Sequence, residues 1–327
     1  MLHRLGSVGL VALMVVACGS SPSRSGFEDE PSAAGTGTQG PVATDPGAIG
    51  GKQAGENPAA DECQKMDIVF VVDDSGSMAE EQNNLAANFP KFISAIEAYK
   101  TKSGAKLDWR VAVTTTGRDV SYTISAGGFN VPQSEKGDNG AFRNTGKCGG
   151  KNRWIDGTDS SPESIFSCRA KAGTSGPSIE MPLYSLKLAL NDRMTDGTNA
   201  GFLRPDALLA IVILTDEDDC SREDNNFTIA NDKCDTMPNV KPVSDYATML
   251  DSVSGGTGRW ATAVIAGDKA CKSSFGDAIQ AKRLQDFVAI AGKNGTFSSI
   301  CDGDLTTGLQ KALDTFDGAC KSYPGPR

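Results

Sequence analysis

Short apolar runs alternate with amphipathic segments along most of the chain. Residues 67–72 (DIVFVV) and 207–215 (ALLAIVILT) are almost entirely apolar, which is the pattern of strands covered on both faces of a parallel sheet. Residues 80–102 carry apolar side chains three and four positions apart, which predicts an amphipathic helix. The same criteria predict further strands at 109–116, 260–266 and 296–300, and further helices at 181–193, 243–253, 278–291 and 305–316.

This alternation of strands and helices predicts an α/β fold. We expect βαβ units that build a central, mostly parallel sheet with helices on both faces, a Rossmann-like three-layer α/β/α arrangement. Two regions depart from the pattern. Residues 120–131 contain Gly127-Gly128 and predict a β-hairpin. Residues 133–178 are polar and glycine-rich, so we expect a long loop that carries two cysteines.

Acidic residues follow both of the buried strands. The first strand leads into Asp73-Asp74-Ser75-Gly76-Ser77, and 207–215 leads into the acidic run Asp216-Glu217-Asp218-Asp219. Because ligands bind at the carboxyl ends of strands in open α/β sheets, both segments should lie at the same edge. Side chains of an extended segment alternate, so Asp73, Ser75 and Ser77 should share one side and Asp74 should point elsewhere.

One carboxylate and two hydroxyl groups are hard oxygen ligands, which suit Mg²⁺, Mn²⁺ or Ca²⁺ rather than zinc or copper. Asp216 would bring a second carboxylate, and the low charge of the site would leave the ion able to accept a carboxylate from a partner. We expect Glu217, Asp218 and Asp219 to form a solvated loop pinned by a disulfide at Cys220, rather than an auxiliary Ca²⁺ site.

Residues 73–77 also fit two other kinds of site. Asp and Ser are favoured at helix N-caps, so the segment could be a turn that only starts a helix. Asp74-Ser75-Gly76 also matches half of an aspartic protease site, but such a site needs two carboxylates and the chain has no second Asp-Ser/Thr-Gly. A phosphatase of the Asp-x-Asp type is disfavoured because residue 75 is Ser.

Asp73-x-Ser75-x-Ser77 after a buried strand, followed later by Leu214-Thr215-Asp216, resembles the von Willebrand factor type A (VWA) domain over about residues 63–320. The resemblance implies a metal-ion-dependent adhesion site (MIDAS), in which an acidic group of the ligand completes the coordination of the ion. The family adds a threonine from a glycine-rich loop before a helix. Thr174 matches that position best, and Ser175 and Ser178 remain alternatives. Mg²⁺ is the ion expected first, with Mn²⁺ or Ca²⁺ possible.

The N-terminus has the pattern of a processing signal. Arg4 precedes a short apolar stretch that ends in Val15-Val16-Ala17-Cys18, which resembles the lipobox of bacterial lipoproteins. We therefore expect a signal peptide at 1–17, acylation of Cys18, a flexible tether at 18–62 rich in Gly, Pro and Ser, and a VWA domain at 63–327. The alternative is a secretory signal with an incidental cysteine. Gly19 favours the outer membrane, facing the periplasm or the cell surface.

The cysteine count fits export. The chain has nine cysteines, and acylation of Cys18 leaves an even set for disulfides in an oxidising compartment. Their connectivity cannot be deduced from sequence, although Cys220–Cys234 and Cys148–Cys168 suit loop staples and Cys63 with Cys320 could tie the domain ends together. The remaining candidates are Cys271 and Cys301. Thiol-bound metal is disfavoured because the chain has no Cys-x-x-Cys pair.

Charge and histidine content exclude several classes of function. The formal net charge of −9 argues against nucleic acid as a partner. The single histidine, His3, lies in the expected signal peptide, so the exported chain would have no imidazole for a Ser-His-Asp or Cys-His site. We therefore expect no enzyme, and instead a membrane-anchored, extracytoplasmic adhesion module that uses a cation to bind an acidic group on a protein partner. The alternative is a metal-independent, disulfide-stapled structural domain of the envelope.

Overall fold

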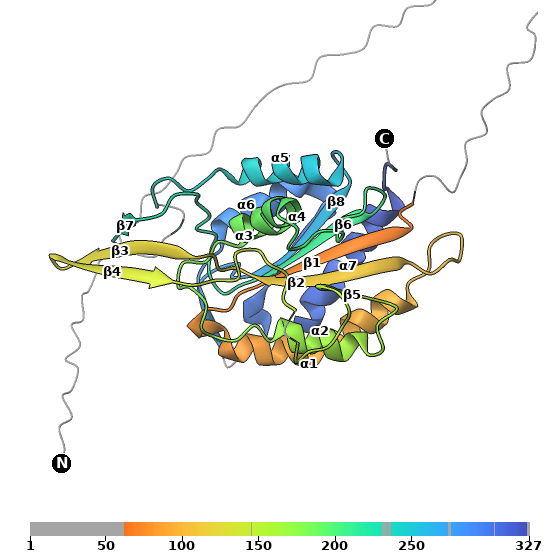
Figure 1. The fold of residues 1–327 in the computed structure, drawn as a ribbon, viewed down its shortest axis with the longest axis horizontal. Coiled ribbons are helices and arrows are strands. Elements are labelled where there is room, and N and C mark those ends of the chain that lie inside the picture. The colour runs from red at the N-terminus through yellow and green to blue at the C-terminus, as the bar shows by residue number, and fades with distance from the viewer. Residues whose placement is uncertain are drawn as a thin grey trace, which may run out of the picture. The chain divides into compact units, whose positions relative to one another are not determined.

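Six strands form the central sheet of the protein. The computed structural model describes residues 62–144, 146–230, 234, 237–273, 276–303 and 305–325. The sheet order is β11-β8-β6-β1-β2-β5, and every neighbouring pair is parallel except β2 with β5 (Figure 1). The strands are β1 (Lys65–Val72), β2 (Asp108–Thr115), β5 (Trp154–Asp156), β6 (Leu208–Leu214), β8 (Trp260–Ala266) and β11 (Gly295–Ser299).

Helices cover both faces of this sheet, which makes three layers (Figure 1). One face packs on α1 (Ala79–Ala98), α2 (Pro162–Ala170) and α7 (Leu305–Lys321). The other face packs on α3 (Pro182–Lys187), α5 (Val243–Ser254) and α6 (Lys282–Ala291). The predicted mixed α/β fold with a central, mostly parallel sheet is therefore confirmed.

The side chains of β1 alternate between two hydrophobic cores, as the pleat of a strand requires. Ile68, Phe70 and Val72 face α1, α2 and α7, whereas Val69 and Val71 face the layer of α3, α5 and α6. The Phe70 ring lies at the centre of an aromatic cluster, with its centroid 5.5, 5.1 and 4.8 Å from the rings of Phe89, Phe92 and Phe166. A strand buried on both faces explains why residues 67–72 lack polar alternation.

The long-loop prediction for 133–178 was wrong in part. The segment includes the end of β4, the strand β5 and the helix α2. β5 has only three residues and pairs with β2 at the sheet edge, so it is too short to show a period. α2 has almost no amphipathic pattern, yet it buries Ile165 and Phe166 against α1 and β2. Its position comes from tertiary packing rather than from periodicity.

Two helix boundaries also differ from prediction. The helix expected at 181–193 is divided into α3, a π-helical turn at Leu188–Asp192 and the short α4 (Arg193–Thr195). The helix expected at 278–291 begins only at Lys282, because the residues before it form a small hairpin of β9 (Cys271–Ser273) and β10 (Gly276–Ala278). The predicted hairpin at 120–131 is confirmed as β3 (Val120–Ala126) and β4 (Phe129–Glu135), which join β7 (Phe227–Ile229) in a second sheet.

Four disulfides join the eight cysteines of the described region. They are Cys63–Cys320, Cys148–Cys168, Cys220–Cys234 and Cys271–Cys301. The three pairings suggested by sequence are confirmed, and the fourth joins the remaining two cysteines. The expected signal peptide, acylation site and tether lie outside the described residues, except for Glu62. No helix in the described part of the chain is long and apolar enough to cross a membrane.

Candidate functional site

The ends of β1 and β6 bring Asp73 to the centre of the candidate site. Val72 and Leu214 are paired neighbours, and the Asp73 amide donates to the Leu214 carbonyl at 2.9 Å. The Asp73 carboxylate is fully buried and accepts hydrogen bonds from the Ser75 amide at 2.8 Å and from the Thr215 hydroxyl at 2.5 Å. Thr116, at the end of β2, donates a longer bond of 3.4 Å. Three parallel strands therefore hold this carboxylate in one orientation.

Ser75 and Ser77 lie together next to Asp73. Their hydroxyl oxygens are 3.0 Å apart, and the chain between them starts a 3-10 turn at Gly76–Met78 that leads into α1. Neither serine side chain caps the helix, since neither the 3-10 turn nor α1 has a side-chain hydrogen bond at its N-cap. The helix-cap interpretation therefore leaves the two hydroxyl groups without an explanation.

Asp216 lies at the edge of a pocket beside this group. The residue is 2% exposed, and its Oδ1 atom has no hydrogen-bond partner. Burial is the main cause that raises its pKa to about 7, and the charges of Asp73 and Glu217 add to the rise, while the neighbouring Ser77 hydroxyl opposes it. A buried carboxylate with an orphan oxygen is costly without a cation or a proton.

The loop with the predicted threonine is bonded to the start of α1. The side-chain amide of Gln82 donates to the Asp73 carbonyl at 2.7 Å and to the Gly173 carbonyl at 2.6 Å, and its oxygen accepts from the Gly173 amide at 3.0 Å. Gln82 thus fastens the loop to the end of β1. Sequence reasoning missed this role, because nothing in the α1 pattern distinguishes Gln82 from other polar residues.

The three candidate hydroxyls of that loop have different surroundings. Thr174 and Ser175 are exposed, between Gly173 and Gly176, which are both bonded to the site. Ser178 is engaged elsewhere, because its hydroxyl donates to Glu135 at 2.7 Å and its amide to the same carboxylate at 3.1 Å. Thr174 therefore stays the predicted loop ligand, and Ser178 is the weakest of the three.

Asp74 packs against the loop at Gly176. Its carbonyl accepts from the Gly176 amide at 2.7 Å, and a Cβ at residue 176 would lie 2.2 Å from the Asp74 carboxylate, so only glycine fits there. Burial raises the pKa of Asp74 to about 7, and the charge of Asp138 adds to the rise. Asp74 is therefore a buried packing residue and not a solvent-exposed one.

Glu180 is a second buried carboxyl that sequence reasoning missed. It is 1% exposed, and neither of its carboxyl oxygens has a partner by hydrogen-bond geometry. Burial holds its pKa well above the ordinary value, and the nearby charges of Asp73 and Glu217 contribute. Burial and the two neighbouring charges therefore all disfavour the ionised form of Glu180.

The prediction of a solvated acidic loop after Asp216 was wrong for two of its three residues. Asp218 and Asp219 are buried. Asp218 accepts from the amides of Arg283 and Leu284 at the start of α6, and Asp219 accepts from the Leu183 amide in the first turn of α3. Both carboxylates therefore bind the free N–H groups of helix starts. The predicted disulfide that pins this loop is present.

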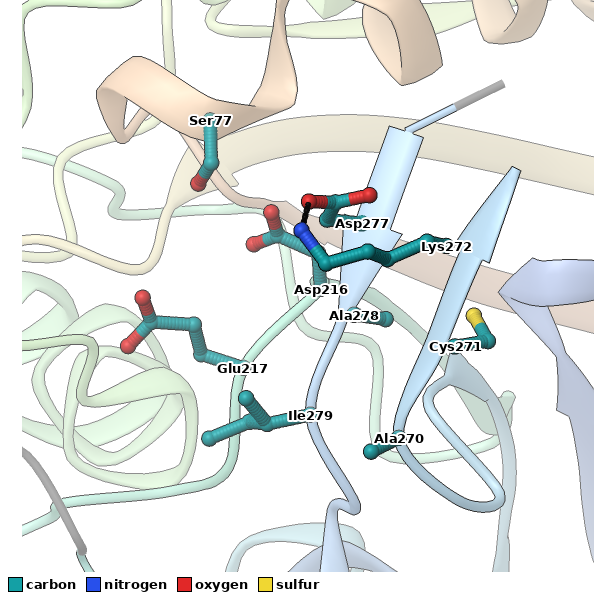
Figure 2. A pocket seen from close by; sticks show the side chains of 9 residues that line it. All are labelled: Ser77, Asp216, Glu217, Ala270, Cys271, Lys272, Asp277, Ala278 and Ile279. Atoms are coloured by element: carbon teal, nitrogen blue, oxygen red, sulfur yellow. Dashed lines mark hydrogen bonds and ion pairs between the residues drawn. The ribbon is translucent and has the colours of Figure 1, made fainter. Parts of the chain in front are cut away.

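The pocket beside Asp216 has a volume of about 460 Å³. Ser77, Asp216 and Glu217 line it on one side, and the β9–β10 hairpin with its flanking residues lines the other (Figure 2). The Lys272–Asp277 ion pair, at 2.5 Å, lies beside Asp216 in this view. The carboxyl ends of the strands thus open into a preformed pocket, as expected for an α/β sheet.

The donor set fits a hard cation. The two carboxylates of Asp73 and Asp216, one with an orphan oxygen, and the hydroxyls of Ser75 and Ser77 are oxygen ligands of the kind that Mg²⁺, Mn²⁺ and Ca²⁺ prefer. Among the described residues, no three acidic, cysteine or histidine side chains form a group that could hold a metal ion. A site here would accordingly depend on hydroxyl groups and on ligands from outside the chain to complete its coordination.

Comparisons with known proteins give low similarity. No protein-family model matches the sequence, and no curated protein matches it. Proximal thread matrix protein 1 from the mussel byssus superposes with a TM-score of 0.40 at 13% identity over 79% of this chain. The pilus adhesin SpaC from Lactobacillus rhamnosus GG gives 0.41 at 12% over 77%, and human COPII-coat protein Sec24c gives 0.42 at 6% over 78%.

The matches span 50%, 30% and 33% of those three chains, respectively. Similarity at this level assigns no family to the chain.

The raised pKa values predict a pH dependence of stability in the absence of metal. Asp74 and Asp216, with pKa values of about 7, bind protons more tightly in the folded state than in the unfolded state, where the pKa is about 4. Their contribution to stability is therefore present below about pH 4 and is lost as the pH rises to about 7. Each group lowers the unfolding free energy by up to about 1.4 kcal/mol per pH unit in this window.

Thermal melts in EDTA between pH 5 and pH 8 test this, and the melting temperature should fall as the pH rises. Asp74→Asn should flatten the slope, because it removes one of the titrating groups. The carboxyls whose pKa is lowered by surface contacts, such as Asp119 and Asp206, titrate below this window and do not mask it. A melting temperature that rises from pH 5 to pH 8 in EDTA contradicts the prediction.

Proposed function

We propose that residues 63–327 form a VWA domain with a MIDAS-type site, in which a divalent cation, Mg²⁺ first, binds an acidic group of a protein partner. The observation that carries the proposal is the pair of buried carboxyls at the ends of adjacent strands. Asp73 and Asp216 are each almost completely buried from solvent, and the charge of Asp73 raises the pKa of Asp216. A divalent cation between them would remove the desolvation cost and the repulsion together.

The strand order also supports a VWA domain. β1 lies inside the sheet between β2 and β6. Asp73 follows β1 and Asp216 follows β6, and these two strands are direct neighbours. Ser75 and Ser77 are in contact beside Asp73. The order of the elements and the position of the acids agree with the VWA pattern expected from the sequence.

Each residue of the site has a distinct role in this proposal. Asp73, Ser75 and Ser77 would hold the ion from the end of β1, Asp216 from the end of β6, and Thr174 from the loop that Gln82 fastens. The ion supplies an electrophilic position that accepts an oxygen of the partner. The chain orients the ion's ligands and presents them at the mouth of the pocket beside Asp216.

The same proposal places the domain outside the cytoplasm on a lipid anchor. The four disulfides support an oxidising compartment. Acylation at Cys18, a tether over 18–62 and an outer-membrane position follow from the sequence pattern alone. The function is then adhesion or protein binding at the envelope, and no enzymatic role is proposed.

A chelator-controlled experiment tests the function. At a hundredfold excess over Kd one bound ion adds about 2.7 kcal/mol of stability, and for a domain of this size the melting temperature should rise by about 5–10 °C over that in EDTA. A pull-down from the cell envelope, done in Mg²⁺ and repeated in EDTA, should recover the partner only with Mg²⁺. The alternative, a metal-independent structural domain, predicts the same melt and the same recovery in both buffers.

A further inference from the structure

The pocket beside Asp216 has an apolar wall that the proposed cation site does not use. Ala270, Ala278 and Ile279 line this wall, and they come from the β9–β10 hairpin and its flanks. Ile279 is 42% exposed and is one of only four large hydrophobic side chains that are exposed in the described part of the chain. Because Ile279 lines a pocket rather than an open surface, an apolar side chain of a bound segment could pack against it.

The wall is fixed relative to Asp216. The Ile279 amide donates to the Asp216 carbonyl at 3.0 Å, so the apolar residue and the candidate metal ligand are joined directly. A Cβ at residue 267 would lie 1.8 Å from the Ile279 carbonyl, so glycine is required for this close approach. The Cys271–Cys301 disulfide ties the start of the hairpin to the 3-10 turn at Ile300–Asp302. The pocket is therefore preformed.

The rim of the pocket carries one cation among its lining residues. Lys272 is 85% exposed and pairs with Asp277, which is 58% exposed. An ion pair this exposed contributes little to stability, so Lys272 can exchange Asp277 for a carboxylate of a bound segment without a large cost. The pocket thus has three binding features. A cation held at Asp216 could bind an acidic group, Ile279 could contact an aliphatic side chain, and Lys272 provides a positive charge at the rim.

We propose that this pocket selects a segment of the partner in which an acidic residue is followed directly by an aliphatic one. The inference rests on the proposed function, because the acidic side chain would bind the cation held by Asp73 and Asp216. The next side chain of the partner would then pack against Ile279, whose amide is bonded to the Asp216 carbonyl. Lys272, which pairs with Asp277 in the free protein, could pair with a carboxylate of the bound segment.

Three fluorescein-labelled peptides test the selection in Mg²⁺ by fluorescence anisotropy: Gly-Gly-Asp-Leu-Gly-Gly, Gly-Gly-Asp-Ser-Gly-Gly and Gly-Gly-Asn-Leu-Gly-Gly. Burial of part of a leucine side chain should make the Asp-Leu peptide bind about five- to tenfold more tightly than the Asp-Ser peptide. The Asn-Leu peptide lacks the carboxylate for the ion and should bind at least about tenfold more weakly than Asp-Leu.

Two matched variants locate the preference. Ile279→Ser should bring the affinity for Asp-Leu down to that for Asp-Ser, without changing the Mg²⁺-dependent melting shift. Ile290→Ser is the control, since Ile290 is similarly exposed, at 47%, but does not line the pocket. Lys272→Gln should weaken all of the aspartate peptides by the same few-fold factor.

The outcomes separate the two proposals. Equal binding of Asp-Leu and Asp-Ser by the unmodified protein, an unchanged preference in Ile279→Ser, or no binding at millimolar peptide overturns the pocket inference. If the melting temperature still rises with Mg²⁺ in that case, the cation site stands. If the melting temperature does not respond to Mg²⁺, Mn²⁺ or Ca²⁺, the proposed function itself is wrong.

Discussion

Asp73→Asn should abolish the stabilisation of the protein by Mg²⁺ or Mn²⁺ and should leave its melting temperature in EDTA the same or higher. Asparagine keeps the shape of the side chain, and its oxygen can still accept from the Ser75 amide. It removes the charge that burial disfavours and that raises the pKa of Asp216. The loss of the metal response, about 5–10 °C in the unmodified protein, is measured by thermal melts with EDTA and with added ion.

The direction of the change in EDTA distinguishes a ligand from a structural residue. A residue that only stabilises the turn through its hydrogen bonds would lower the melting temperature in both buffers when replaced. Asp74→Asn is the matched control, because Asp74 is also buried and adjacent but packs against Gly176. It should keep the metal response. If Asp73→Asn keeps the full rise in melting temperature with metal, Asp73 is not a ligand of the ion. If Asp74→Asn loses that rise, Asp74 is needed for ion binding.

Removal of the Cys63–Cys320 disulfide should cause the largest loss of stability among the four. The two cysteines are separated by 257 residues, so the bond closes almost the whole described chain into one loop. In the chain-entropy model a loop of this length contributes about 5.5 kcal/mol. The double variant Cys63→Ser with Cys320→Ser should lose about that much unfolding free energy, measured by urea denaturation.

The double variant Cys148→Ser with Cys168→Ser is the comparison for that loss of unfolding free energy. This pair is separated by only 20 residues, and the same model assigns it about 3 kcal/mol. The longer loop should therefore cost more when opened. Equal losses, or a larger loss for the shorter loop, would mean that local packing rather than chain entropy governs the stability of this domain.

The parts of the fold that follow from one dominant pattern could be predicted from sequence. Residues 67–72 and 207–215 are buried on both faces, so their apolar runs identify them as strands and place them in the sheet interior. β5 and α2 could not be predicted in this way. β5 is three residues long, and α2 buries its apolar side chains without an amphipathic period. The formation of both elements depends on the strands and helices that they pack against.

The candidate site divides in a similar way. Asp73 and Asp216 follow predicted strands, so their shared edge could be expected from topology. Gln82 and Asp219 act through contacts with residues far away in the sequence, such as the bond of Asp219 to Leu183, and Glu180 is buried near Asp73 and Glu217. Nothing local distinguishes a carboxylate that caps a helix from one that faces solvent. The sequence of the acidic run therefore predicts a solvated loop, although Asp218 and Asp219 are buried.

Strand β1 has a mechanical consequence if the domain is anchored at its N-terminal side and holds a partner at Asp73. β1 runs from Lys65, just after Cys63, to Val72, just before Asp73. A pull between anchor and partner would act along this one strand. β1 pairs in parallel with β2 over eight residues and with β6 over seven, so both ladders would hold the loaded strand in place while its covalent backbone carries the tension. Most of the rest of the domain would then carry little of the tension.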